Sequence, residues 1–420
     1  MEPSLKPLNI LCWLCVCLFS AYEMMSRVSL GVFQTAIMND LHIHSAQFAL
    51  LSSTAYALTT GLLQIPVGIF FGRFSFRSIL LITTAIGIVG NVALMMATDF
   101  QSMLIFRVFS ASGAAFGYLS SILSVLILFP RKNHGIFIGL TNFITCISAS
   151  FIAGPLAQFF AYCQIAWHNI FLIFAIMNAV IFLCALHFPN FKASRKSEKS
   201  NGNTSNHNNT TLIRDILIAS TCIMFLVEYL SENHGHLLLM SKNINEVTAA
   251  YILSLMWMGY AFCGPVAGYL IDKNYDFYKL LLFFSLGFFI SLLALIYNQG
   301  AVQYNTIWVA LFGIFSGGQG MVYPMASKLV RSQYRAVLLG AIGAFYHISV
   351  ALFSPLLSYW IDGFSLTPSL FDYQHALIPL LPVAAIPFFI AFFNQKKQIK
   401  RLFMHAFFRL KLIQPSTESS

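Results

Sequence analysis

Twelve long apolar segments, separated by short polar ones, run along almost the whole chain. Most are as long as the roughly 20 residues that a helix needs to cross the hydrocarbon core of a bilayer. They lie near residues 8–37, 46–71, 78–98, 101–128, 135–161, 169–188, 213–240, 247–271, 279–297, 305–327, 336–360 and 375–394. A lipid-embedded backbone must satisfy its own hydrogen bonds, so this pattern predicts an all-α membrane protein with twelve transmembrane helices.

The composition strengthens this interpretation. Hydrophobic residues make up 58% of the 420 residues, and charged residues only 9%. An ordinary soluble domain carries about 25% charged residues, so this chain could not cover a soluble surface. A soluble enzyme, a disordered chain and a disulfide scaffold are excluded. Seven of the eight cysteines lie inside apolar segments, where they read as small buried residues, and Cys163 falls in a polar connection.

The charge pattern fixes the expected orientation. The net charge of +10 could indicate a nucleic-acid partner, but the basic residues cluster in alternate connections instead. With both termini in the cytoplasm, 21 of the 24 Lys and Arg fall on the inner side, Lys242 falls outside, and Arg27 and Arg107 lie within spans. This positive-inside asymmetry predicts cytoplasmic termini and no nucleic-acid binding.

Polar segments divide the chain into parts. Residues 190–212 are rich in Asn and Ser and read as a cytoplasmic linker between two six-helix bundles, 1–189 and 213–394. Basic and apolar residues alternate in the tail, 395–420, which predicts an amphipathic helix on the anionic inner leaflet of the membrane lipid.

The two bundles share an internal repeat. Glycines, prolines and basic residues recur at a separation of 200 residues, in the pairs Gly68 and Gly268, Arg73 and Lys273, Gly113 and Gly313, Gly117 and Gly317, and Pro155 and Pro355. Two parallel six-helix pseudo-repeats are a transporter architecture.

At this point the chain resembles the major facilitator superfamily over nearly its whole length. The family carries a Gly-x-x-x-Asp-Arg-x-Gly-x-Arg type motif after span two; here Gly68, Arg73 and Arg77 are kept, and Gly72 replaces the aspartate. The second half carries a copy with the acid, at Gly268, Asp272 and Lys273. The resemblance implies that these loops act as gating latches favouring an outward-facing state. The basic residues could equally be topological anchors.

Two further stretches resemble family patterns. Arg107, followed by Gly113 and Gly117, resembles an arginine that takes part in substrate binding or proton coupling in the family. The stretch Tyr22-Glu23-Met-Met-Ser-Arg27 resembles a branch that includes phagosomal nutrient transporters of intracellular bacteria. The short termini favour a bacterial inner membrane, and a eukaryotic organelle is the alternative. Span five lacks further glycines of the drug-antiporter motif, so a multidrug antiporter is disfavoured.

Several ionisable residues lie within the spans, where each costs roughly 2.5–3.5 kcal/mol to insert unless it faces a cavity or a partner. Glu23 and Arg27 share one face of span one, and Glu228, Glu232 and His236 share a face of span seven. Glu23 and Arg27 could instead form a structural ion pair. From the residues and the resemblance we expect substrate contacts from Arg27, Arg107, Tyr22, Gln319, Tyr323 and His347. We expect proton coupling from Glu23, Glu228 and Glu232.

The leading hypothesis is a monomeric secondary transporter that moves a small-molecule substrate (an amino acid, small peptide or organic anion) with protons by alternating access. A proton-independent facilitator, a siderophore or metabolite exporter, and a non-transporting membrane sensor are the alternatives. The chain carries no HExxH, GxSxG, Walker or metal-cluster motif, so we expect no enzyme activity, no metal and no cofactor.

Overall fold

A computed structural model describes residues 5–189, 207–364 and 369–413. Within these ranges, eleven helical segments are long and apolar enough to cross a membrane, and two helices meeting at a 43° bend form a twelfth. The described residues contain helices and no strand. The predicted all-α membrane fold is therefore confirmed.

The first six spans come from the N-terminal half. Their helices and helical turns are α1 (Pro7–Val32), α2 (Gln34–Leu41), α3 (Ser45–Ala49), η1 (Leu50–Thr54), α4 (Ala55–Arg73), α5 (Phe76–Met95), α6 (Phe100–Ala114), α7 (Gly117–Leu128), η2 (Arg131–Asn133), α8 (His134–Phe151), η3 (Ile152–Leu156), α9 (Ala157–Tyr162) and α10 (Asn169–Leu186).

The other six spans come from the C-terminal half. Their elements are α11 (His207–Tyr229), η4 (Leu230–His234), α12 (Gly235–Met240), α13 (Glu246–Asp272), α14 (Phe277–Tyr297), α15 (Val302–Ser316), η5 (Gly317–Met321), α16 (Val322–Leu329), α17 (Ser332–Asp362), α18 (Leu370–Ala376) and α19 (Leu380–Ile413).

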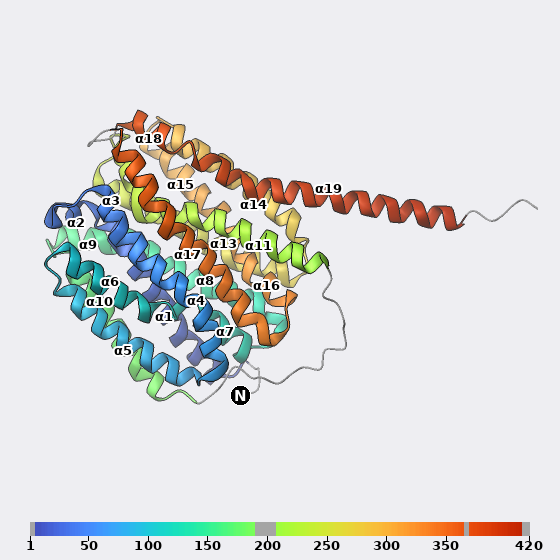
Figure 1. Cartoon of the computed structure of the whole chain (residues 1–420), viewed down its shortest axis with the longest axis horizontal. Helices are drawn as coiled ribbons and strands as arrows, with labels where there is room; N and C mark the ends of the chain where they lie inside the picture. The colour runs from blue at the N-terminus through green and yellow to red at the C-terminus, as the bar shows by residue number, and fades with distance from the viewer. Residues whose placement is uncertain (1–4, 190–206, 365–368, 414–420) are drawn as a thin grey trace, which may run out of the picture.

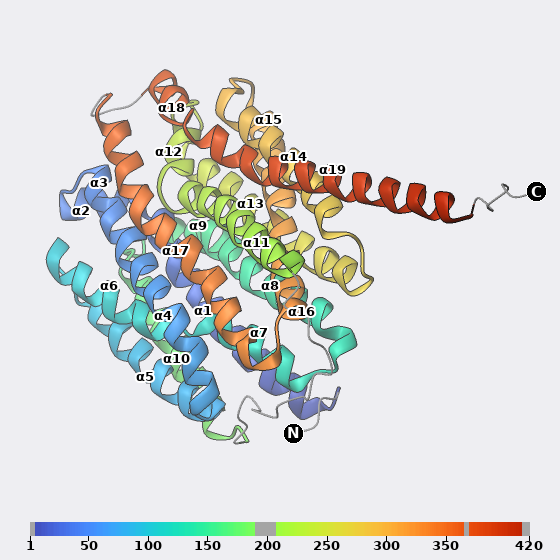
Figure 2. The same cartoon turned by 45° about the vertical axis from the view of Figure 1, so that its right-hand side comes forward.

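The two halves meet along two helix pairs. Helix α4 packs along α17, and α8 packs along α13, as Figures 1 and 2 show. Both contacts depend on glycine. A Cβ added at Gly68 would lie 2.7 Å from the Ala336 carbonyl oxygen, and one added at Gly268 would overlap the Gly135 carbonyl. Small residues let the backbones approach, which is how membrane helices gain packing energy.

The two ends of the bundle differ in charge. The N-terminus lies at the end where α4 meets α5, α7 meets α8 and α16 meets α17 (Figure 2). We call this the basic end, because its connections are flanked by Arg73, Arg131, Lys132, Lys273 and Arg331. The opposite end, which we call the distal end, carries α2, α9 and α12 (Figure 2).

In the part of the chain that the structure describes, three spans contain a π-helical turn that the apolar pattern did not reveal. These turns are η1, η3 and η4, and all three lie in the distal halves of their spans. A π-turn inserts an extra residue into the i→i−4 ladder and is frequent at functional sites. Since η1 and η4 contact each other, the two halves meet at the distal end through two irregular helical turns.

Two predicted boundaries differ from the helix ends. Helix α11 already begins at His207, inside the predicted linker, and the rest of that linker lies outside the described residues. Helix α19 runs without a break from Leu380 through Ile413, so the twelfth span and most of the tail form one helix that projects beyond the bundle (Figure 1).

Candidate functional site

A small cavity lies between the two halves near the centre of the bundle. Its volume is about 20 Å³, room for about one water molecule. Its lining comes from both halves: Glu23, Met24, Arg27, Tyr118, Asn142, Thr145 and Cys146 from the first, and Met224, Trp257, Tyr260, Gln319, Tyr323 and Tyr346 from the second. In this state the cavity therefore has no room for a solute larger than a water molecule.

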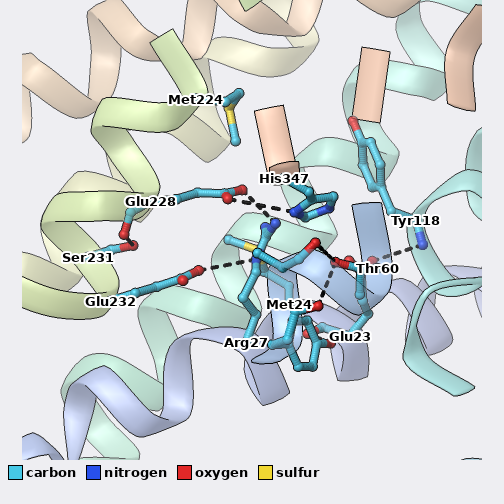
Figure 3. A network of polar contacts seen from close by, with 12 residues as sticks. Glu23, Met24, Arg27, Thr60, Tyr118, Met224, Glu228, Ser231, Glu232 and His347 are labelled. Atoms are coloured by element: carbon cyan, nitrogen blue, oxygen red, sulfur yellow. Dashed lines mark hydrogen bonds and ion pairs between the residues drawn. The ribbon is translucent and has the colours of Figure 1, made fainter. Parts of the chain in front are cut away.

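Arg27 joins the two halves beside this cavity. Its Nη1 lies 2.5 Å from Oε1 of Glu228, and its Nε lies 3.5 Å from Oε1 of Glu232. Figure 3 shows Arg27 reaching both glutamates from α1. All three side chains are at least 95% buried. The main partners of Arg27 therefore lie 201 and 205 residues away, rather than one helical turn away at Glu23.

Glu23 is held differently. Its Oε2 accepts a hydrogen bond from the backbone N–H of Tyr118 at 2.9 Å. That amide is free because span four breaks between Ala114 and Gly117, so Tyr118 lies at the start of a new helix. The carboxylate is directed towards the amide end of α7, and Glu23 lines the cavity together with Arg27.

Glu228 and Glu232 carry the remaining contacts of the cluster. Oε2 of Glu228 lies 3.8 Å from Nδ1 of His347, and Oε2 of Glu232 accepts a hydrogen bond from the Ser53 hydroxyl at 3.3 Å. Among the described residues, Oε2 of Glu228 and Oε1 of Glu232 have no hydrogen-bond donor. Buried carboxylate oxygens without donors are costly, so the hydrogen bonding of these two glutamates is incomplete in this state.

Arg107 and Tyr22, two of the residues expected to contact substrate, do not line the cavity in this state. The guanidinium of Arg107 donates to the Ser26 carbonyl at 2.9 Å and lies 4.4 Å from the Tyr56 ring centroid. Tyr22 accepts a hydrogen bond from Asn91 at 2.8 Å. Both side chains hold α1 in place. His347 is absent from the lining too, and it faces Glu228 instead.

The charge balance of the cluster is uneven. Two guanidinium groups, Arg27 and Arg107, lie among three buried carboxylates, Glu23, Glu228 and Glu232. Fully ionised, these five groups would leave one negative charge uncompensated in a water-poor interior, which is expensive. One proton on a glutamate makes the cluster neutral.

Of the uncharged residues that line the cavity, Gln319 and Tyr323 were expected, whereas Tyr118, Asn142 and Tyr260 escaped the sequence analysis. The hydroxyl of Tyr118 donates to Asn142 at 2.6 Å, and its ring meets Tyr323 edge-on at 5.2 Å between centroids. Tyr260 donates to Gln319. The sequence offers one signal for this part of the lining, because Asn142, Thr145 and Cys146 recur on one helical face.

The distal closure is built from polar side chains. The Asn233 amide donates to the Ser53 hydroxyl at 2.8 Å, and Ser52 donates to Asn233 at 3.1 Å. These contacts join η1 to η4. Gly31 brings α1 against the same turn, since a Cβ there would lie 2.7 Å from the Ser231 carbonyl oxygen.

The basic closure uses the main chain. Oδ2 of Asp272 accepts a hydrogen bond from the Ile136 N–H at 3.0 Å, so the acid of the second motif copy caps the first turn of α8. Lys328 lies 4.0 Å from the same carboxylate. At the first motif copy, Gly68 packs on Ala336, Arg73 is exposed and Arg77 is half-buried. Lys273 lies over the Tyr269 ring.

The comparison with known families agrees with this architecture. A family model described as Major Facilitator Superfamily matches residues 13–354, and again 216–403. The chain belongs to this superfamily. Membership indicates a membrane transporter that is not an enzyme. No curated protein matches the sequence.

Two solved structures share the fold. Both are crystal structures of a bacterial homolog of the human lysosomal transporter Spinster, in inward-facing conformations. The unoccupied form has a TM-score of 0.69 at 17% identity, covering 94% of this chain and 99% of that one. The occupied form has a TM-score of 0.66 at 17% identity, covering 94% and 98%. At this identity the likeness concerns the fold alone.

No group of three or more His, Cys, Asp or Glu in the described part of the chain has a metal-binding arrangement.

Proposed function

We propose that this chain is a proton-coupled secondary transporter that moves a small polar solute, such as an amino acid, small peptide or organic anion, by alternating access. The observation that carries the proposal is the buried cluster around Arg27, which joins the two halves at a closed cavity and which one added proton would make neutral. If the cluster served only to pair Arg27 and Arg107 with carboxylates, two glutamates would be enough, and a third buried one would not be needed.

The exchange of partners at Arg27 gives the mechanism. A proton on Glu228 removes the charge that holds the Arg27 guanidinium at 2.5 Å. The freed guanidinium then binds the carboxylate of a solute bidentately, while Glu23 accepts its ammonium group. A zwitterion adds no net charge, so the protonated and loaded cavity is neutral and can close and reopen towards the other end.

We propose that the basic end faces the cytoplasm, following the positive-inside rule, in a bacterial inner membrane. Protons and solute would then enter from the distal end and leave at the basic end. The glutamates suit this direction because Glu232 lies in the π-turn that forms the distal closure.

The test is uptake by proteoliposomes with an imposed pH gradient, using a panel of amino acids and small peptides. Glu228→Gln and Glu232→Gln are compared with Asp99→Asn, an exposed helix cap at the distal end that Asn caps equally well. We expect gradient-driven accumulation to fall at least about tenfold in one or both glutamine variants, roughly the effect of 1.4 kcal/mol. Solute exchange at equal pH should persist, since it moves no net proton.

Full gradient-driven accumulation in both glutamine variants would remove the coupling proposal. Accumulation by the unmodified chain that ignores the pH gradient would identify a facilitator.

A further inference from the structure

Three cavities follow one another from the distal surface to the central site. The first, which we call the vestibule, has a volume of about 270 Å³ and lies between α1, α9, α12 and α13. A narrow cavity of about 10 Å³ comes next and shares Val32, His236 and Ala250 with the vestibule. The narrow cavity shares Trp257 with the central cavity. The shared residues place the three in a row.

We propose that the vestibule is a first binding station for the ammonium group of the solute, and that Trp257 separates it from the central site. This inference rests on the proposed function and adds to it the entry route and the charge of the leading group.

The charge of the vestibule favours a cation. Its polar lining is Gln158, Gln164, Trp167, His236 and Glu246, and its described lining includes no Lys or Arg. Trp167 already donates its N–H to Asp40 at 2.7 Å, so its ring is fixed at the wall. An acidic side chain, amide oxygens and aromatic faces are what an ammonium group binds.

His236 offers an acceptor at the inner end of the vestibule. Its Nε2 lies 3.1 Å from the backbone oxygen of Glu246. A carbonyl oxygen only accepts, so Nε2 carries the hydrogen and Nδ1 of the neutral ring is left as an acceptor. Nδ1 is buried and has no hydrogen-bond partner among the described residues, while the side chain is 3% exposed and lines two cavities.

Trp257 forms the barrier that follows. It is 1% exposed and lines both the narrow and the central cavity, and its Nε1–H has no partner within the described ranges. A buried indole N–H normally finds an acceptor. A passing carboxylate would supply one. The route therefore presents acceptors for the ammonium group first and a donor afterwards.

Chemical labelling of the full-length protein in nanodiscs tests this route without transport. The probes are a cationic reagent, 2-aminoethyl methanethiosulfonate, and an anionic one, 2-sulfonatoethyl methanethiosulfonate, each normalised to its rate with free cysteine. Ala250→Cys reports on the vestibule, native Cys146 reports on the central cavity, and Ala111→Cys is a fully buried control away from all three cavities. Every variant also carries Cys163→Ser, which removes an exposed thiol.

We expect Ala250→Cys to react far faster than Ala111→Cys. It should also prefer the cationic reagent by about tenfold, the ratio that an attraction of about 1.4 kcal/mol to one nearby negative charge would give. Adding Glu246→Gln should remove most of this preference while labelling continues. Trp257→Ala should raise the labelling rate of Cys146, and Trp257→Phe, which keeps a ring, should raise it less. Peptide mass mapping identifies the labelled cysteine.

Labelling of Ala250→Cys no faster than that of Ala111→Cys, or a preference for the anionic reagent, would overturn the proposal that the vestibule binds the ammonium group. An unchanged Cys146 rate in both Trp257 variants would overturn the barrier. If Ala111→Cys becomes reactive in Trp257→Ala, only the Trp257→Phe result is used. Labelling needs no turnover or gradient, so a failure of proton-driven uptake would leave these outcomes intact.

Discussion

The distal and basic ends of the cavity are both closed, but by different chemistry. At the distal end Ser52 and Ser53 of η1 bind Asn233 and Glu232 of η4, beside the Arg27 pair. At the basic end glycines bring backbones together, and Asp272 binds a main-chain amide.

This difference indicates whether protonation or added side-chain volume weakens each closure. Contacts between side chains that include a carboxylate weaken when a proton arrives. Backbone packing through glycine is insensitive to protonation but fails when volume is added. We infer that the distal closure responds to the charge of the cluster, whereas the basic closure responds mainly to helix geometry.

The largest effect should come from Arg27→Gln. It removes the cation from beside two buried carboxylates, which costs about 3–5 kcal/mol of unfolding free energy. The double variant Arg27→Gln/Glu228→Gln should recover much of this loss, because it removes both charges, while transport stays lost. Denaturation of the purified protein, analysed as a double-mutant cycle, measures the coupling. Strictly additive losses would show that the two residues do not interact.

A smaller loss is expected when the basic closure is overpacked. Gly268→Ala places a methyl group against the Gly135 carbonyl and should cost about 1–3 kcal/mol. The matched control is Gly363→Ala, where the nearest atom to an added Cβ is 3.3 Å away. Thermal denaturation compares the two. Equal, small shifts would mean that α8 and α13 have room to separate.

The acid of the basic closure should matter less. Asp272→Asn keeps an acceptor for the Ile136 N–H but removes the charge at the start of α8, a change of about 0.3–1 kcal/mol. Salt screens this term, so the difference from the unmodified protein should shrink at high ionic strength. Asp276→Asn is the control, since Asn also caps α14. An effect that salt leaves unchanged would argue for packing instead.

Removing one hydroxyl from the distal closure should cost about 0.5–1.5 kcal/mol. Ser53→Ala deletes the group that accepts from Asn233 and donates to Glu232. The control is Ser349→Ala, whose exposed hydroxyl only binds its own helix. We expect Ser53→Ala to change the pH dependence of uptake while Ser349→Ala leaves it unchanged. Identical pH profiles of uptake in the two variants would show that the Ser53 hydroxyl does not influence the charged cluster.

Another small effect concerns Lys242 at the distal end, where burial lowers the pKa of the amine to about 8. Below pH 8 the amine is charged in both the folded and the unfolded state. Between pH 8 and about 10.4 the folded state loses its proton first, so stability rises with pH there. Because the side chain is only half-buried, we expect about 1 kcal/mol at most. Lys242→Gln should flatten this rise, whereas Lys132→Gln, at the basic end, should not.

The fold could be read from the sequence because its signal is long and repeated. Apolar segments of about 20 residues leave few alternatives in a bilayer, so the twelve spans agree with the helices to within a few residues at most ends. The π-turns at Leu50–Thr54 and Leu230–His234 could not be predicted from their own residues, which include no Pro or Gly, whereas the third, Ile152–Leu156, contains Gly154 and Pro155. A local contributor to the second turn is the residue after it, Gly235, because a Cβ there would overlap the Leu230 carbonyl oxygen that its N–H contacts.

The site was only partly predictable. Charges in spans one and seven correctly marked residues that meet across the halves, because isolated charges in lipid must find partners. The sequence did not indicate which of these charged residues pair with each other. The i,i+4 rule favours Glu23 with Arg27, but the break in span four offers Glu23 an amide, and Arg27 turns to Glu228. Whether Arg107 faced the cavity or the Ser26 carbonyl depended on helix rotation, which sequence does not specify.

The π-turns at Leu50–Thr54 and Leu230–His234 have one more consequence. Each holds one residue more than a regular helix needs, and relaxing to ordinary winding would swivel the residues beyond it by about 100°. Ser53 and Glu232 lie within these turns. A change of winding at either site would therefore break the contacts of Ser53 with Glu232 and Asn233 together, without unfolding a helix or sliding one past another.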